Sequence, residues 1–115
     1  MDNQLIRKEQ WKEFFEFTSK YFLQGQQVEL EVAGLDIGDQ IEEEWIQLEG
    51  LSYDPKENIL FVHTLVNDHP IADPLEIVSS EDGATTQSIA VRDSSGNVQI
   101  IKFRSPIRIE ASRST

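Results

Sequence analysis

The first long pattern along the chain is helical. Between residues 7 and 23, Trp11, Phe14, Phe15, Thr18 and Phe22 recur at i, i+3, i+4, i+7 and i+11. This spacing places them on one face of a helix, and the charged residues fall mostly on the opposite side. Gly25 is a suitable C-terminal stop. The pattern predicts an amphipathic helix over residues 7–23, whose aromatic stripe covers one face of a sheet.

Beyond Gly25 the apolar period changes from 3.6 to 2, which indicates strands. Val28, Leu30 and Val32 alternate with polar residues, as in a strand with one solvent-exposed face. Further strands are expected at residues 44–53, 59–66, 87–92 and 97–104, with a short edge strand at 75–78 and a final bridge at 107–109. Gly50 shifts the apolar phase within residues 44–53, as a β-bulge does. Residues 59–66 are apolar on both alternating faces, which favours a central strand.

Turn-forming residues separate these strands. The segments 36–39, 54–58, 81–84 and 93–96 are rich in Asp, Gly, Asn, Ser or Pro. Gly96 stands where a bulged hairpin loop needs a left-handed residue. Residues 67–74 contain two prolines and two aspartates, so we expect an irregular crossing segment there.

This order of elements predicts an α+β fold, with an N-terminal amphipathic helix packed on an antiparallel meander of about five or six strands. The meander either stays an open sheet or bends into a small SH3-like or Sm-like barrel with the helix at one end. The glycine-broken strand slightly favours bending. Without repeats or a long linker, residues 1–110 are expected to form a single domain and residues 111–115 a frayed polar tail.

Charge and composition narrow the function classes. The 115 residues include 21 Asp and Glu against 10 Lys and Arg, a formal charge of -11. Such a field repels nucleic acid and anionic membranes, so neither is an expected partner. The chain has no cysteine, which excludes disulfides, thiolate metal sites and cysteine nucleophiles. No signal-like or membrane-spanning apolar run is present, which predicts a cytoplasmic protein.

His63, Asp68 and His69 are the main candidates for chemistry, with further carboxylates nearby. Imidazole and carboxylate groups serve both as metal ligands and as acid/base pairs. The two histidines are six residues apart, which matches neither a helical nor a strand zinc pair. The simpler interpretation makes His63 an ordinary sheet residue and Asp68 the cap of a turn.

An acidic cluster precedes Trp45 and comprises Asp36, Asp39, Glu42, Glu43 and Glu44. It could hold a hard cation, but the calcium-loop pattern is missing, and a solvated strand edge explains it better. Trp45 faces away from Ile46 on a strand, so it is either core or a semi-exposed anchor for a cationic or peptide partner. No serine lies in a nucleophile elbow, no triad is legible, and no cofactor is expected.

Several segments carry a family resemblance. These are W-K-E-F-F-E-F-T-S at residues 11–19, G-L-D-I-G-D-Q-I-E-E-E-W-I-Q-L-E-G-L-S-Y-D-P at 34–55, D-H-P-I-A-D-P-L-E-I at 68–77 and G-N-V-Q-I-I-K-F-R-S-P-I at 96–107. The chain resembles the bacterial family DUF5335 over nearly its whole length, with Pro70 as a departure where an aliphatic residue is expected. The resemblance implies a single domain and no reaction, cofactor or catalytic residue.

The sequence therefore favours a small acidic non-catalytic interaction or assembly module, with a protein partner or a homodimer formed through a sheet edge. The alternative is a metal-assisted or acid/base enzyme that uses His63, Asp68 and His69. An RNA-binding Sm-like module would suit the strand order but conflicts with the negative charge.

Overall fold

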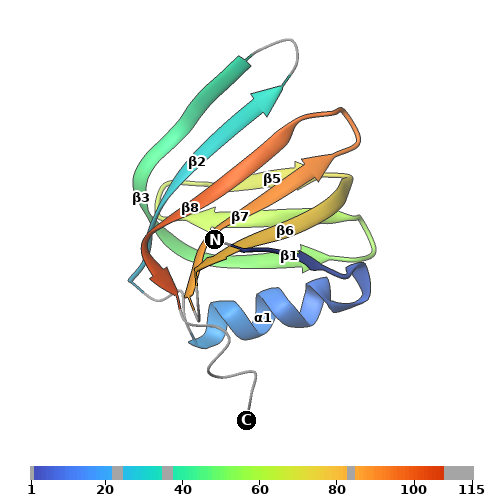
Figure 1. Ribbon diagram of the computed structural model, residues 1–115, viewed down its shortest axis with the longest axis horizontal. Coiled ribbons are helices and arrows are strands. Elements are labelled where there is room, and N and C mark those ends of the chain that lie inside the picture. Colours follow the sequence, from blue (N-terminus) through green and yellow to red (C-terminus); the bar gives the residue numbers. More distant parts are fainter. Residues whose placement is uncertain (1, 22–24, 35–37, 83–84, 108–115) are drawn as a thin grey trace.

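The computed structural model describes residues 2–21, 25–34, 38–82 and 85–107. The helical part consists of a 3-10 turn, η1 (Lys8–Gln10), and the helix α1 (Trp11–Tyr21) (Figure 1). The strands are β1 (Asp2–Ile6), β2 (Gln27–Gly34), β3 (Gly38–Asp54), β4 (Ile59–Thr64), β5 (Asp68–Ala72), β6 (Pro74–Asp82), β7 (Thr85–Asp93) and β8 (Val98–Ile107). The described chain is mostly β, with one short α-helix near its N-terminus.

All neighbouring strands pair antiparallel, in the order β1-β6-β7-β8-β2-β3-β4-β5. Within the described residues β1 and β5 each pair on one side only, so the sheet is open and the expected barrel closure is not confirmed. The sheet contains eight strands, more than the five or six expected. The two hairpins around residues 54–58 and 93–96 form as predicted, and Gly96 has the left-handed φ of 87°.

β3 is the strand on which the sheet turns back over itself. Its first part pairs with β2 as far as Gln47, and its second part, from Leu48, pairs with β4. A register shift between Leu48 and Gly50 confirms the bulge predicted at Gly50. In Figure 1, β4 and β5 lie behind β6, β7 and β8, and the buried side chains of both layers belong to one hydrophobic core.

The aromatic stripe of α1 is buried as predicted. Trp11 and Phe15 are 1% and 0% exposed, Thr18 is also buried, and Phe14 is half-buried. Trp11 packs edge-on against Tyr53 of β3, with the ring centroids 5.2 Å apart. Its indole Nε1 donates a hydrogen bond of 2.8 Å to the carbonyl of Ile6. The helix begins later than expected, at Trp11, and Phe22 and Leu23 of the predicted helix lie outside the described residues.

Ser19 joins α1 to the part of β3 that no longer pairs with β2. The backbone N–H of Leu51 donates to Ser19 Oγ at 2.8 Å, and Ser19 Oγ donates to the Leu51 carbonyl at 2.7 Å. The Ser19 side chain thus supplies the two hydrogen bonds that a neighbouring strand would otherwise make with the N–H and carbonyl of Leu51. Covering an edge with a helix is a common protection of unpaired strands.

Three strand predictions need correction. β1 is a strand that the apolar pattern did not predict, and its Leu5 and Ile6 pair with Val78 and Ile77 of β6. The segment predicted to be irregular forms β5, which accommodates Pro70 because it is an edge strand. β6 is not an edge strand, since it lies between β1 and β7.

Two further details differ from the sequence pattern. β4 ends at Thr64, so the apolar Leu65 and Val66 follow the strand and are 63% and 60% exposed. Residues 36–37 and 83–84 of the expected turns, Ile109 of the expected bridge and the predicted tail all lie outside the described residues. None of the described helices has the length and apolar character needed to cross a membrane.

Candidate functional site

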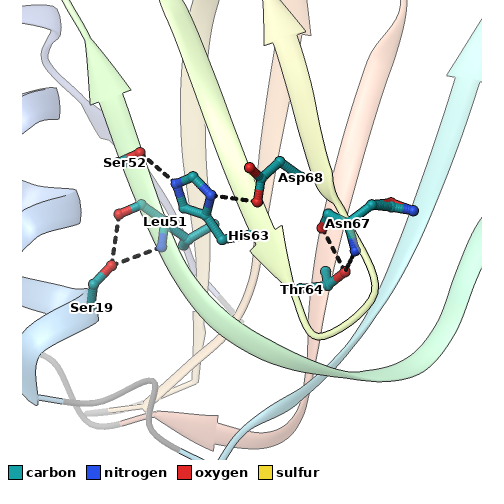
Figure 2. A network of polar contacts seen from close by, with 7 residues as sticks. All are labelled: Ser19, Leu51, Ser52, His63, Thr64, Asn67 and Asp68. Carbon is teal, nitrogen blue, oxygen red and sulfur yellow. Dashed lines mark hydrogen bonds and ion pairs between the residues drawn. The ribbon is translucent and has the colours of Figure 1, made fainter.

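Ser52, His63 and Asp68 form a continuous polar network (Figure 2). His63 Nε2 lies 2.8 Å from Ser52 Oγ, and His63 Nδ1 lies 2.8 Å from Asp68 Oδ1. The three residues come from β3, β4 and β5. His63 Nδ1 and Nε2 therefore each have a polar partner on an adjacent strand.

Strand register brings these residues together. His63 is directly opposite Gly50 on one side and Asp68 on the other, while Ser52 is opposite Phe61. Because side chains two positions apart share a sheet face, Ser52 lies diagonally across from His63 on that face. A side chain at Gly50 would face Ser19 of α1, whose Oγ lies 3.6 Å from the Cβ position.

The ring of Phe61 stacks against the imidazole of His63. Its centroid is 5.8 Å from that of His63, and the two planes differ by only 13°. The side chain of His63 is 34% exposed and that of Asp68 is 64% exposed, so solvent and small molecules reach the network. Its chemistry would therefore take place at the protein surface.

His69 does not join this network. It pairs with Val62, whereas its neighbour Asp68 pairs with His63, so the two histidines lie on opposite faces of the sheet. His69 Nε2 is buried without a hydrogen-bond partner, and its nearest charged neighbour is Glu43 Oε1 at 3.7 Å. The structure thus joins His63 to Asp68 and places His69 in a separate contact.

No three His, Asp or Glu side chains in the described part of the chain gather in a geometry that could hold a metal ion. Of the predicted acidic cluster, Glu42 and Glu44 are exposed, and Glu43 faces His69. Asp36 lies outside the described residues, as does the side chain of Asp39.

Trp45 is half-buried and lies in an irregular part of β3. The pairing of β2 with β3 shifts between Val28 and Leu30, so that β3 contains extra residues there. Trp45 has a φ of 51°, an unusual conformation for a bulky side chain. The guanidinium carbon of Arg104 lies 5.7 Å from its ring centroid. A cation from the same chain therefore already covers this tryptophan.

A groove of about 490 Å³ lies between β1, β6 and α1. Phe14 and Phe17 of α1 line it with apolar surface, together with Glu13 and Glu81. Leu5 also borders the groove, but Leu5 pairs with Val78 while Gln4 and Ile6 pair with Ser79 and Ile77, so the Leu5 side chain, which is 63% exposed, faces the other side of the sheet. The sequence reasoning did not find this groove, since β1 was not expected to be a strand.

Two features missing from the sequence-based prediction thus define the candidate sites. They are the role of Ser52 beside His63 and the groove next to an edge strand. By fold, the protein is an open antiparallel sheet flanked by one helix, with a surface Ser-His-Asp network on β3 to β5.

Comparison with known proteins identifies the family. The model of the family of unknown function DUF5335 matches residues 2–112, so the chain belongs to this family, and the predicted resemblance is confirmed. An uncharacterized protein of the bacterium Aquifex aeolicus (strain VF5) is 41% identical over 109 residues, which cover 93% of this chain and 96% of that protein. No solved structure matches the chain significantly.

Proposed function

We propose that this protein is an interaction module that binds an extended segment of a protein partner in the groove between β1 and α1. The observation that carries the proposal is an edge strand beside an apolar groove. β1 pairs only with β6 among the described residues, and Gln4, Leu5 and Ile6 line the groove. A partner strand can add to such an edge through backbone hydrogen bonds while its side chains enter the groove.

The groove also indicates the chemistry of the partner. Phe14 and Phe17 offer apolar contact, while Glu13 and Glu81 add acidic residues to the lining. The formal charge of -11 adds a long-range attraction for cations. An extended segment that alternates apolar and basic residues therefore fits best.

The same charge argues for a protein partner over nucleic acid or an anionic membrane. A cytoplasmic location is part of this proposal, and cell fractionation would test it. Recovery of the protein in the membrane or the nucleic-acid fraction would contradict it.

Fluorescence anisotropy with a labelled hexapeptide of alternating valine and lysine tests the proposal directly. We expect binding in the micromolar range that weakens as salt is added, and no binding of the peptide in which glutamate replaces lysine. N-methylation of alternate peptide nitrogens on the pairing edge should abolish binding, because it removes the backbone donors of an added strand.

Phe17→Ala and Phe61→Ala form a matched pair of variants, because both phenylalanines are half-buried and both changes remove one ring, but only Phe17 lines the groove. Burial of a phenylalanine side chain contributes about 1.5–3 kcal/mol, so Phe17→Ala should weaken peptide binding by about tenfold or more. Phe61→Ala should bind like the wild type. Equal effects of both substitutions would refute the groove as the binding site.

Sedimentation of the protein alone tests whether a second copy of the chain occupies the groove instead of a peptide. A dimer that Phe17→Ala dissociates, together with no peptide binding, would show that a second copy occupies the groove beside the β1 edge. That result would overturn the peptide proposal and support an assembly module.

A second candidate function is acid/base chemistry at His63. The contact of 2.8 Å between His63 Nδ1 and Asp68 Oδ1 favours it, because a carboxylate that holds one imidazole nitrogen leaves the other able to accept a proton. His69 lies on the opposite sheet face. His63→Gln should therefore abolish any hydrolytic activity, whereas His69→Gln serves as its matched control.

A further inference from the structure

The protonation pattern of the Ser52 network follows from its partners. An ionised Asp68 carboxylate can only accept hydrogen bonds, so in the neutral imidazole the proton resides on Nδ1 and points at Asp68 Oδ1. His63 Nε2 then presents a lone pair to the hydroxyl of Ser52, 2.8 Å away. This is the relation between a general base and the nucleophile that it activates.

The sheet holds this geometry without help from a loop. Ser52, His63 and Asp68 lie on three paired strands, and the stacked ring of Phe61 restrains the imidazole plane. Functional groups on paired strands are positioned more accurately than groups on loops. The contact therefore exists before any substrate binds.

The surroundings indicate what could react. Phe61 is opposite both Ser52 and Pro70, so an apolar row crosses the same sheet face beside the hydroxyl. The exposure of His63 and Asp68 admits small molecules from solvent. A small ester with a short or flat acyl group could lie over Phe61 with its carbonyl carbon at Ser52.

We propose that Ser52 is an acyl-transfer nucleophile for small carboxylic esters, with His63 as general base and Asp68 as a positioning residue; this inference rests on the second candidate function. Ser52 Oγ bonds to the carbonyl carbon while its proton moves to His63 Nε2. The C–O bond to the alcohol breaks, and the alcohol leaves with that proton. Water then attacks the acyl-serine, gives a proton to Nε2, and Ser52 recovers it as the acid departs.

The first experiment is covalent labelling of the native protein. A fluorophosphonate should add one phosphonyl group, and peptide mapping should place it on Ser52. The same peptide mapping shows whether the label is on His63 instead. Absence of a label on Ser52 under conditions that label a known serine hydrolase would overturn the inference, whatever any variant does.

The second experiment measures hydrolysis of p-nitrophenyl acetate. Ser52→Ala and His63→Gln should each lose at least about tenfold in rate, while His69→Gln keeps the wild-type rate. Asp68→Asn should lower kcat with KM unchanged, since it affects the imidazole and not substrate contact. Thermal unfolding of each variant verifies that the fold is intact, and Ser52→Val, which also removes the hydroxyl, provides a substitute if Ser52→Ala does not fold.

These outcomes separate the inference from the function on which it rests. If His63→Gln loses the activity and Ser52→Ala keeps it, His63 acts as a base on water; the acid/base function then stands and the serine nucleophile is refuted. If neither variant differs from His69→Gln, both proposals fail, and the network only connects three strands.

Discussion

Replacing Ser19 with alanine tests how α1 is attached to the sheet. The Ser19 hydroxyl accepts from the N–H of Leu51 and donates to its carbonyl, at 2.8 and 2.7 Å. Alanine is the better helix former, so propensity alone predicts a small gain in stability. The structure predicts the opposite, because two backbone groups of β3 lose their partner at a contact that α1 partly buries.

The magnitude follows from those two groups. An unsatisfied buried donor or acceptor costs about 1–3 kcal/mol, and partial access to water reduces this cost. We therefore expect Ser19→Ala to lower the free energy of unfolding by about 1–3 kcal/mol in total. For a chain of this size, that corresponds to a fall in Tm of roughly 4–12 °C.

Thr18 supplies the matched control one residue earlier in the same helix. Its side chain is 0% exposed, and its Oγ1 has no hydrogen-bond partner in the described structure. Thr18→Val keeps the shape and removes a buried unpaired hydroxyl, so it should be neutral or stabilising by about 1 kcal/mol. Urea unfolding followed by circular dichroism measures both variants. Similar destabilisation by both, or an effect of Ser19→Ala below about 0.5 kcal/mol, would refute the attachment described for α1.

Three further outcomes are expected. Asp73 is exposed and has a φ of 53°, so Asp73→Gly should stabilise the fold by about 0.5–1 kcal/mol in urea unfolding, whereas Asp73→Val should destabilise it. Burial raises the pKa of Tyr53 in the folded state. The neutral phenol therefore stabilises the fold fully below about pH 10, and this stabilisation is lost as the pH rises through the folded-state pKa. Tyr53→Phe should diminish that loss when Tm is measured at alkaline pH. Hydrogen bonds to Glu29 and Glu31 raise the pKa of Lys102. Because the Lys102 side chain is 45% exposed, solvent screens these pairs, and Lys102→Met should destabilise the fold by only about 0.5–1 kcal/mol, an effect that Glu29→Gln should relieve in a double-mutant cycle.

Apolar periodicity predicts the elements whose buried face can be recognised from one continuous segment of the sequence. The stripe of Trp11 and Phe15 indicates α1, and the turn compositions indicate the hairpins of β3 with β4 and of β7 with β8. The edge strands behave differently. β1 is largely polar and β5 contains Pro70, so only their pairing with β6 and β4 defines them as strands.

The same difference explains what was missed at the candidate site. A turn at residues 54–58 that pairs Asp54 with Ile59 also places Ser52 opposite Phe61 and therefore on the face of His63. That part was accessible from the sequence. The pairing of His63 with Asp68 was not, because it requires β5 to be a strand. The positions of His63 and His69 on opposite faces follow from the same pairing.

The pairing of β1 with β6 has a consequence for synthesis on the ribosome. Residues 2–6 emerge long before residues 77–81, with which they pair. At about 5–20 residues per second, this delay of roughly 70 residues lasts about 4–14 s. During that time the backbone of β1 is unpaired and Ile6, which is 8% exposed in the folded protein, is uncovered, so the nascent chain presents a short unpaired segment that chaperones can bind.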